Sequence, residues 1–336
     1  MPRPLRIEFP GACYHVVFRG NARRPVFRED ADKELLVDCM ARFASLFRIR
    51  IRAYCVMVNH AHIHVRTDEA NLGRYMQSFL TSYTARHNHR HDSCGHVFQG
   101  RYKAFLVEDC RVWRSRCTRY IHLNPARIPG LDDAPVETRR EAIRQCRWSS
   151  LGAVLGLRPR PDWLDRDAVL RGWGETAAAR RTAYARFVDA GLVEDIADPL
   201  EAAAAGALIG GEAFIDRMRR ALTDLSENVN VRRESAQQRR LASWCALERV
   251  VAAVAREYGC EQAELLRRHN RGCEARQVLL YLAATHCQGR YSLSELGLEL
   301  GPVTVGTISA ARQRVAARAA EDSGLRQRID AIEGTL

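Results

Sequence analysis

The sequence predicts an α+β fold, in which a ferredoxin-like antiparallel sheet with helices packed on one side is followed by an all-α C-terminal domain. Two observations predict it. Strand-like and helix-like segments alternate over residues 1–150 in the order βα-ββ-αβ-α, which is typical of such a sheet. From about residue 235 onward, apolar residues recur with the helical period. We therefore expect a sheet-containing domain at 1–150, a helical connecting region at 151–234 and a helical domain at 235–336.

β-Branched and aromatic residues mark the expected strands, and the helical period marks the helices between them. In chain order, the expected elements are a strand at Tyr14–Gly20, a helix at Glu29–Phe47, strands at Ile49–Met57 and Ala61–Thr67, a helix at Leu72–His89, a strand at Val97–Val107 and a helix ending at Leu123. Asp109 is a candidate N-cap for the last helix, because a carboxylate can accept hydrogen bonds from its first amides. Asn124-Pro125 should end it, since the residue before a proline disfavours helical geometry.

Two short segments near the C-terminus predict a helix-turn-helix. Ser292 can cap a helix that ends at Gly301, Pro302 turns the chain, and Thr304 can cap a second helix. That second helix would carry a polar face formed by Thr307, Ser309, Arg312, Gln313 and Arg314. Such a face favours binding of duplex DNA, and the alternative is an ordinary helical hairpin with a solvated charged face.

Composition indicates the kind of partner. The chain of 336 residues has a formal charge of +12 at pH 7 and a pI near 9.5, which favours a polyanion such as nucleic acid. No apolar run approaches the ~20 residues that span a bilayer, and the first residues lack the apolar region of a signal peptide. We expect a cytoplasmic, nucleoid-associated protein with no membrane partner. The 11 cysteines include no CxxC pair and should be reduced and structural.

Three histidines alternate along one expected strand. His60, His62 and His64 should therefore project from the same face. Two imidazoles side by side on a rigid strand can hold a metal ion. The alternative is a sheet face that carries histidines without a ligand, but three in alternation within a basic chain favour the metal site.

A second polar pair lies at the end of the helix before Pro125. Tyr120 and Asn124 are four residues apart and share a helix face, and Asn124 at the helix end is free to point into a site. Taken with the histidines, the pair indicates a site in which Asn124 supplies an oxygen ligand and Tyr120 a nucleophile. His122 should point elsewhere and not act as the base for Tyr120.

Four ordered motifs resemble the REP-associated tyrosine transposases of the single-tyrosine HUH superfamily. The motifs are Tyr14–Asn21, Met57–His62, Gly95–Lys103 and Arg119–Pro125. Matched position by position, the resemblance implies that His60 and His62 bind the metal, that Tyr120 is the nucleophile and that Asn124 is a polar helper. The C-terminal part resembles the helix-turn-helix domain of the replication initiator DnaA.

Three positions depart from the family pattern. Val58 stands where the family usually has proline, Ala61 where it has a larger residue, and His64 where it generally has an aliphatic one. The last departure leaves two registers open, because His62-Ile63-His64 also satisfies the HUH pattern. Asn59-His60 before Ala61 fits the family register better and favours His60 and His62.

The resemblance also implies a reaction. Mg²⁺ or Mn²⁺ would be the cofactor, and attack by Tyr120 would give a 5′-phosphotyrosine and a free 3′-hydroxyl, so a second 3′-hydroxyl could reseal the strand without ATP. The family's usual substrate is a short imperfect palindrome folded as a hairpin. The residues expected to bind the single strand are Arg19, Arg23, Arg24, Gln99, Arg101, Tyr102 and Lys103.

Two other functions would use the same surface. One is a catalytically silent, domesticated, sequence-specific DNA-binding protein, and the other is an HUH replication initiator or relaxase. The intact set of His60, His62, Tyr120 and Asn124 favours the enzyme, because a binding protein has no need of that combination. The chain could act as a monomer or a homodimer, with Tyr120 serving its own subunit or the partner's.

Overall fold

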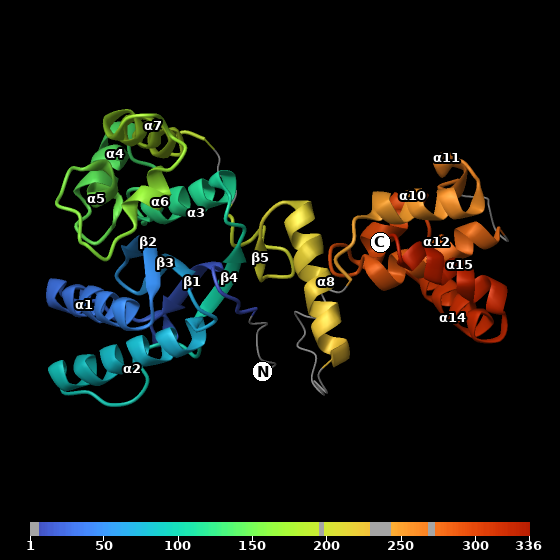
Figure 1. Ribbon diagram of the computed structural model, residues 1–336, viewed down its shortest axis with the longest axis horizontal. Coiled ribbons are helices and arrows are strands. Elements are labelled where there is room, and N and C mark those ends of the chain that lie inside the picture. The colour runs from blue at the N-terminus through green and yellow to red at the C-terminus, as the bar shows by residue number, and fades with distance from the viewer. Residues whose placement is uncertain (1–6, 195–197, 229–242, 268–272) are drawn as a thin grey trace. The chain divides into compact units, whose positions relative to one another are not determined.

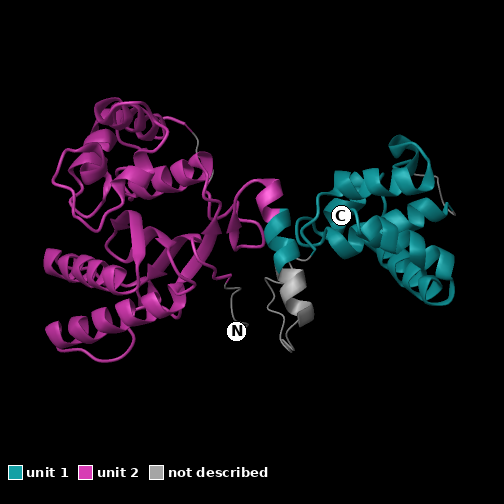
Figure 2. Cartoon of the chain, in the orientation of Figure 1, with its two compact units in different colours: residues 1–5, 216–336 teal, residues 6–215 magenta. Residues whose placement is uncertain are grey.

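The computed structural model describes residues 7–194, 198–228, 243–267 and 273–336, with the side chains of 222–228 outside the description. The chain divides into two compact units: the first in chain order contains residues 6–215 (magenta, keyed as unit 2 in Figure 2) and the second contains residues 216–336 (teal, keyed as unit 1). The segment 151–215 belongs to the same unit as the sheet. Among the described helices, none has the length and apolar character needed to cross a membrane.

The first unit contains a sheet and the helices around it (Figure 1). Its elements are β1 (Cys13–Arg19), α1 (Asp30–Leu46), β2 (Ile49–Val56), β3 (His60–Thr67), α2 (Leu72–Arg90), β4 (Lys103–Val107), α3 (Arg111–Leu123), α4 (Val136–Gln145), α5 (Leu151–Leu155), α6 (Arg166–Leu170), α7 (Ala177–Ala190) and β5 (Leu208–Ile209), with short 3-10 turns at Asn21–Arg23 and Asn124–Ala126. The α+β class and the expected order βα-ββ-αβ-α are confirmed.

The sheet has the strand order β2-β3-β1-β4-β5. Its first four strands pair antiparallel, as expected, whereas β5 pairs with β4 in parallel and makes the sheet mixed. β5 follows α7 in the chain and lies in a segment expected to be only a helical connection. β1 is therefore the middle strand of the five, with β3 and β4 on either side of it.

Helices lie on both faces of the sheet, so the expectation of helices on one side was wrong. Phe18 of β1 packs edge-on against Phe79 of α2, with ring centroids 5.7 Å apart. His15 of the same strand lies 5.8 Å from the ring of Tyr120 on α3. Residues three apart on a strand point to opposite faces, which places α2 and α3 on opposite sides (Figure 1). The physical reason is that nearly all side chains of β1 and β3 are buried, whichever face they project from, so helices must pack on both faces to exclude water.

β4 is shorter than the expected strand at Val97–Val107. Gly95 and Gly100 adopt positive φ angles of 92° and 60°, which interrupt extended pairing before Lys103. Only an isolated bridge between Gly20 and Phe98 remains of the first part of that strand.

Helices are the only regular secondary structure among the described residues of the second unit. Its elements are α8 (Glu212–Asn228, which contains the boundary between the units), α10 (Leu247–Tyr258), α11 (Gln262–Leu265), α12 (Glu274–His286), α13 (Leu293–Glu299), α14 (Val305–Glu321) and α15 (Ser323–Glu333). The apolar residues that predicted these helices, such as Val250, Val254, Leu279 and Leu282, are buried in one core.

The helix-turn-helix elements form as the caps predict. The Ser292 side chain accepts a hydrogen bond from the Glu295 amide, and that of Thr304 accepts one from the Thr307 amide. The turn needs glycine at 301, where φ is +79° and a Cβ would lie 1.8 Å from the Leu266 carbonyl oxygen. On α14, the residues expected to face DNA are exposed except for half-buried Ser309; the exposed ones are Thr307, Arg312, Gln313 and Arg314.

Candidate active site

One face of β3 carries a row of histidines. The antiparallel register with β1 pairs His15 with His64 and Arg19 with His60, and side chains paired in this way project from the same face. His62 alternates with His60 and His64 and shares that face. The sheet thus adds His15 to the three histidines expected from the sequence.

His60 and His62 are held in similar ways. Nδ1 of His60 lies 2.7 Å from Oδ1 of Asn59, and Nδ1 of His62 lies 3.0 Å from Nε2 of His15. The two rings stand edge to face with centroids 5.0 Å apart. Hydrogen bonds of this kind fix the orientation of histidines that bind metals. Since Asn59 and His15 engage the two Nδ1 atoms, Nε2 of each ring is the nitrogen that can face a cation.

Both imidazoles are neutral at pH 7. Burial lowers the pKa of His60 to about 4, with a further contribution from the charge of Arg19 and an opposing one from a hydrogen bond with the Asn124 side chain. Burial, followed by the proximity of His15, lowers the pKa of His62 well below its usual value. Neutral imidazoles have the lone pair that a metal ion requires, so the pair is ready to coordinate.

His64 lies deeper in the sheet than the other two. It is fully buried, and neither of its ring nitrogens has a hydrogen-bond partner. Burial, and then the charge of Arg52, lowers its pKa well below the usual value. This enclosed position favours the register in which His60 and His62 form the site.

Tyr120 reaches this row of histidines from α3. Its ring centroid lies 5.7 Å from that of His62 and 5.8 Å from that of His15, and the residue is only 8% exposed. The guanidinium of Arg127 lies over the ring, 5.1 Å from its centroid. Burial, and then the charge of Asp198, raises the pKa of the phenol above its ordinary value.

Asn124 lies one helical turn after Tyr120. Its Nδ2 donates to the carbonyl oxygens of Tyr120 at 2.9 Å and Ile121 at 3.3 Å, so its amide nitrogen faces the end of α3. The same side chain interacts with His60. The structure therefore brings together His60, His62, Tyr120 and Asn124, the four residues that the sequence singled out.

Asp198 is part of the site although no sequence pattern indicated it. Its Oδ2 accepts a 2.9 Å hydrogen bond from the Tyr120 phenol, and its Oδ1 accepts one from the Leu200 amide at 2.8 Å. It lies outside any helix or strand and 78 residues after Tyr120. Only the folded chain brings the two together.

A buried hydrogen-bond network fixes α3 and with it Tyr120. The Tyr184 hydroxyl of α7 donates to Thr118 at 2.9 Å, and His122 bridges Tyr184 at 3.0 Å and Ser150 at 2.8 Å. Burial lowers the pKa of His122 to about 3, so it is neutral. His122 thus points away from Tyr120, in agreement with the sequence prediction.

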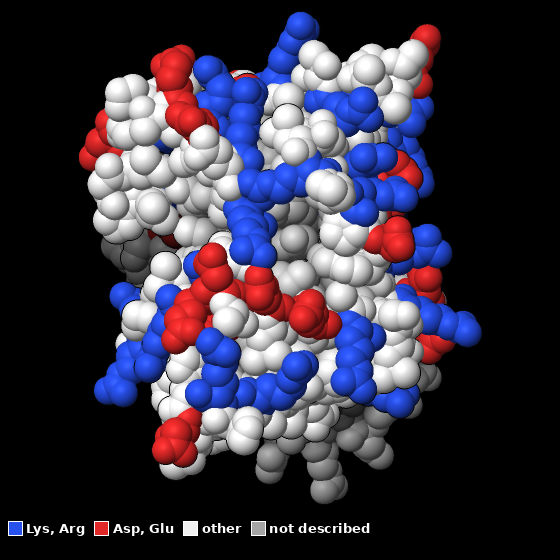
Figure 3. Space-filling view, turned by 90° about the vertical axis from the view of Figure 1, so that its left-hand side faces the viewer, with Lys and Arg blue, Asp and Glu red and all other residues white. Residues whose placement is uncertain are grey.

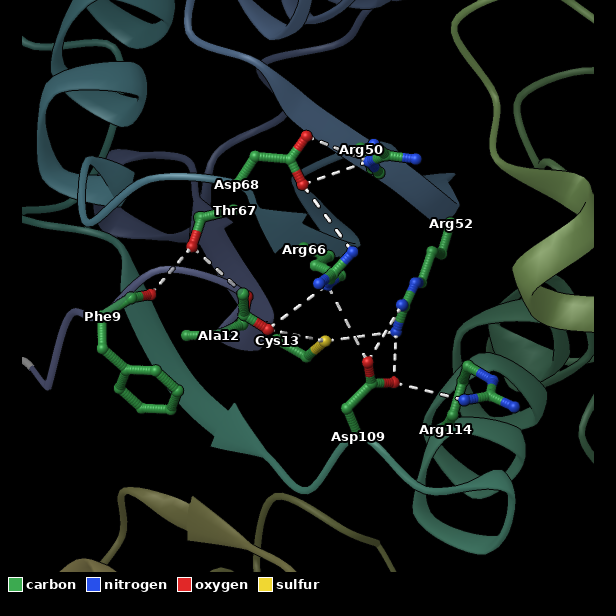
Figure 4. Close-up of polar contacts among 11 residues, drawn as sticks. Phe9, Ala12, Cys13, Arg50, Arg52, Arg66, Thr67, Asp68, Asp109 and Arg114 are labelled. Carbon is green, nitrogen blue, oxygen red and sulfur yellow. Dashed lines mark hydrogen bonds and ion pairs between the residues drawn. The ribbon is translucent and has the colours of Figure 1, made fainter.

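Asp109 does not cap α3, so that prediction was wrong. The N-cap is Cys110, and Asp109 instead binds Arg52 of β2 at 2.7 Å and Arg114 of α3 at 3.2 Å (Figure 4). Burial by itself would raise the pKa of Asp109, but the Arg52 guanidinium outweighs it and lowers that pKa well below its usual range. Arg52 is buried and requires a counter-charge, which explains why the carboxylate is directed to it.

The residues expected to bind single-stranded DNA are mostly accessible. Arg19, Arg23, Arg24, Gln99, Arg101 and Lys103 are exposed. Tyr102 is buried, so its ring is not available for stacking on a base. On the face formed by the left-hand side of Figure 1, basic side chains surround a band of acidic ones (Figure 3). The positive charge on that face is therefore not continuous, because acidic side chains lie between the basic ones.

Residues 9–124 match the profile of a family described as Transposase IS200 like. This part of the chain is an IS200-like transposase domain. The match runs through β1 and β3 to Asn124 and includes His60, His62 and Tyr120.

One solved structure is similar at a lower level. It is described as the REP associates tyrosine transposase bound to a REP hairpin, and the likeness covers 49% of this chain and 94% of that chain at 16% identity with a TM-score of 0.36. No curated protein matches the chain.

Proposed function

We propose that this domain cuts and rejoins single-stranded DNA through a covalent bond between Tyr120 and a 5′-phosphate. One observation carries the proposal: the Tyr120 ring packs against His62, while Asn124, from the next turn of the same chain segment, interacts with His60. A nucleophile and a candidate metal site thus adjoin within a transposase domain. Neither a structural helix nor a simple DNA-binding surface requires this combination.

The donor set fits a divalent cation. The Nε2 atoms of His60 and His62 are neutral donors on one strand, and the Asn124 side chain, which interacts with His60, adds an oxygen donor from the turn after α3. Bound there, Mg²⁺ or Mn²⁺ would polarise a non-bridging oxygen of the scissile phosphate and reduce its negative charge.

The chain's own residues account for the remaining steps. The Tyr120 oxygen attacks phosphorus, so an O–P bond forms while the bond between phosphorus and the 3′-oxygen breaks. The phenolic proton passes to Asp198 along the hydrogen bond that already joins them, and the 3′-oxygen leaves as a hydroxyl after taking a proton from water. In the reverse reaction a 3′-hydroxyl displaces Tyr120 and reseals a strand.

Exposed cations support a DNA path to this site. Arg19 pairs directly with His60 across the sheet, and Arg23 and Arg24 follow β1. We infer that they bind phosphates of a single strand beside a hairpin, because a flexible strand can bring its phosphate to the buried tyrosine. The exposed polar face of α14 would add recognition of duplex DNA, and the protein would act as a monomer or homodimer.

A cleavage assay with the full chain tests the proposal. Oligonucleotides labelled at the 3′ end and carrying palindromes that flank the gene are offered as hairpins, as unfolded strands and as duplexes, with Mg²⁺, Mn²⁺ or a chelator. We expect a labelled adduct that survives denaturation, requires the metal and forms with the hairpin but not with the duplex. Tyr83→Phe is the matched control, because the buried Tyr83 hydroxyl has no hydrogen-bond partner to lose. Binding of hairpins without any cleavage would contradict the proposal and favour a DNA-binding protein.

A further inference from the structure

A second group of candidate metal ligands lies where α1 begins and α2 ends. Asp32, His87 and His91 each offer one ligand atom, and these atoms lie within 4.8 Å of one another. Asp32 and His87 are buried, and His91 is half-buried. α2 covers the face of the sheet opposite Tyr120, so this group is separate from the candidate active site.

His87 has one ring nitrogen without a partner. Its Nε2 lies 3.1 Å from the Val26 carbonyl oxygen, which can only accept, so Nε2 carries the proton and Nδ1 the lone pair. Nδ1 is buried in a residue that is only 6% exposed, and it has no hydrogen-bond partner. The adjoining Asn88 side chain donates to the Gly95 carbonyl oxygen and accepts from the Ser93 hydroxyl, and its interaction with the imidazole acts to raise the pKa of His87 against the larger effect of burial. Histidines that bind metals typically donate from one ring nitrogen to a backbone carbonyl and coordinate through the other. His87 has this arrangement, with Nε2 on the carbonyl and the lone pair on Nδ1.

The other two ligands are also oriented. Oδ2 of Asp32 accepts hydrogen bonds from the amides of Arg28 and Glu29 before α1, which leaves Oδ1 to face His91. Nε2 of His91 lies 2.7 Å from that Oδ1, and the rings of His87 and His91 are 4.4 Å apart. His87 and His91 are four residues apart, so the turn of α2 places them on one side.

We propose that Asp32, His87 and His91 bind a divalent transition-metal ion of the zinc class. Two imidazoles and one carboxylate suit Zn²⁺, Co²⁺ or Ni²⁺ better than Mg²⁺, which prefers oxygen ligands. Three protein ligands leave a fourth position for water. The ion would replace the hydrogen bond between His91 and Asp32, releasing its proton to solvent, and would tie the start of α1 to the end of α2.

The surrounding charges are compatible with this ion. Arg90 lies beside Asp32, with Nε 3.5 Å from its carboxylate, but its guanidinium is also bound by Glu29 at 2.6 Å. Asp32 supplies the negative charge, and burial is the main cause that lowers the pKa of His87 and keeps it neutral.

Co²⁺ binding tests the proposal independently of nuclease activity. The full chain carrying His60→Gln and His62→Gln is titrated with Co²⁺, so that the candidate active site contributes nothing. We expect one bound equivalent with ligand-field bands and no thiolate charge-transfer band, and a melting temperature that rises by about 5 °C at a hundredfold excess over Kd. His87→Gln and His91→Gln should each abolish both effects. His89→Gln should preserve them, because His89 is exposed on the same helix.

Three outcomes would overturn it. These are an absence of Co²⁺ binding, equal binding by the His87→Gln and His89→Gln proteins, or a charge-transfer band that assigns the ion to cysteine. His91→Gln keeps the experiment decisive if His87→Gln unfolds, because a half-buried glutamine at 91 can still donate to Asp32. Since the titration does not measure cleavage, its failure leaves the proposed function of Tyr120 untouched.

Discussion

The phenol of Tyr120 donates a 2.9 Å hydrogen bond to Oδ2 of Asp198, a residue 78 positions later in the chain. The contact joins the end of the matched transposase segment to a loop beyond it. Burial and the Asp198 charge both raise the pKa of the phenol, so the nucleophile is protonated in the resting protein. A base is therefore required, and Asp198 is the group already in contact.

Replacing Asp198 by Asn should slow cleavage at pH 7 by about 100-fold, the usual contribution of a general base. The loss should shrink as the pH rises, because removing the carboxylate lowers the pKa of Tyr120 and makes the phenolate easier to form. Single-turnover rates from pH 6 to 10 measure this, with Asp198→Glu as the variant that retains a carboxylate. An unchanged rate in the Asn variant would remove Asp198 from the mechanism.

Asn59 should strengthen metal binding without touching the metal. Its Oδ1 fixes Nδ1 of His60, and removing such an outer partner typically weakens metal affinity by about 10-fold or more. For Asn59→Ala, we expect a higher Mn²⁺ concentration at half-maximal cleavage and a near-normal rate at saturation. Asn59→Asp keeps the acceptor and should behave like the wild type. Equal metal dependence of all three proteins would show that this hydrogen bond does not orient the ligand.

His64→Leu should retain cleavage and stabilise the protein. Both ring nitrogens of His64 are buried without partners, and removing an unsatisfied polar group gains about 1–3 kcal/mol. Metal-dependent cleavage and the chemical denaturation midpoint are the two measurements, with His62→Gln as the variant that should lose activity. Loss of metal-dependent cleavage in His64→Leu would move the site to the His62 and His64 register.

Stability should fall as the pH drops below about 6.5, the ordinary pKa of an unfolded histidine. Burial holds the pKa of His122 at about 3 in the folded protein, so between these values only the unfolded chain takes up the proton. The contribution of His122 is therefore complete above pH 6.5 and declines by about 2 kcal/mol by pH 5. Urea unfolding at pH 7 and at pH 5 measures the fall in the free energy of unfolding between the two pH values. That fall should be smaller in His122→Gln than in the wild-type protein by about 2 kcal/mol. An equal loss in both proteins would mean that His122 is protonated in the fold.

Local periodicity predicted the parts of the site that lie on single elements. Alternation along β3 placed His60, His62 and His64 on one face, and the helical turn placed Tyr120 beside Asn124. These relationships depend only on the geometry of one strand or one helix, so they hold in any tertiary fold that contains those elements.

Relationships between distant segments could not be predicted in the same way. Asp198 lies in a loop with no pattern that relates it to Tyr120. Asp109 has the residue type of an N-cap, yet the buried guanidinium of Arg52, 57 positions away, draws its carboxylate instead. The packing of helices on both faces of the sheet also depends on long-range structure, namely on which face α2 and α3 each pack against. Burial of both faces of β1 is visible only in the assembled sheet.

Identification of the residue that becomes attached to DNA tests the central claim most directly. The metal-dependent adduct is trapped, digested with protease and nuclease, and examined by mass spectrometry for a nucleotide on tyrosine. We expect the modification on Tyr120, its loss in Tyr120→Phe with hairpin binding retained, and its persistence in Tyr83→Phe. An adduct that forms in Tyr120→Phe, or a nucleotide found on another residue, would contradict the account.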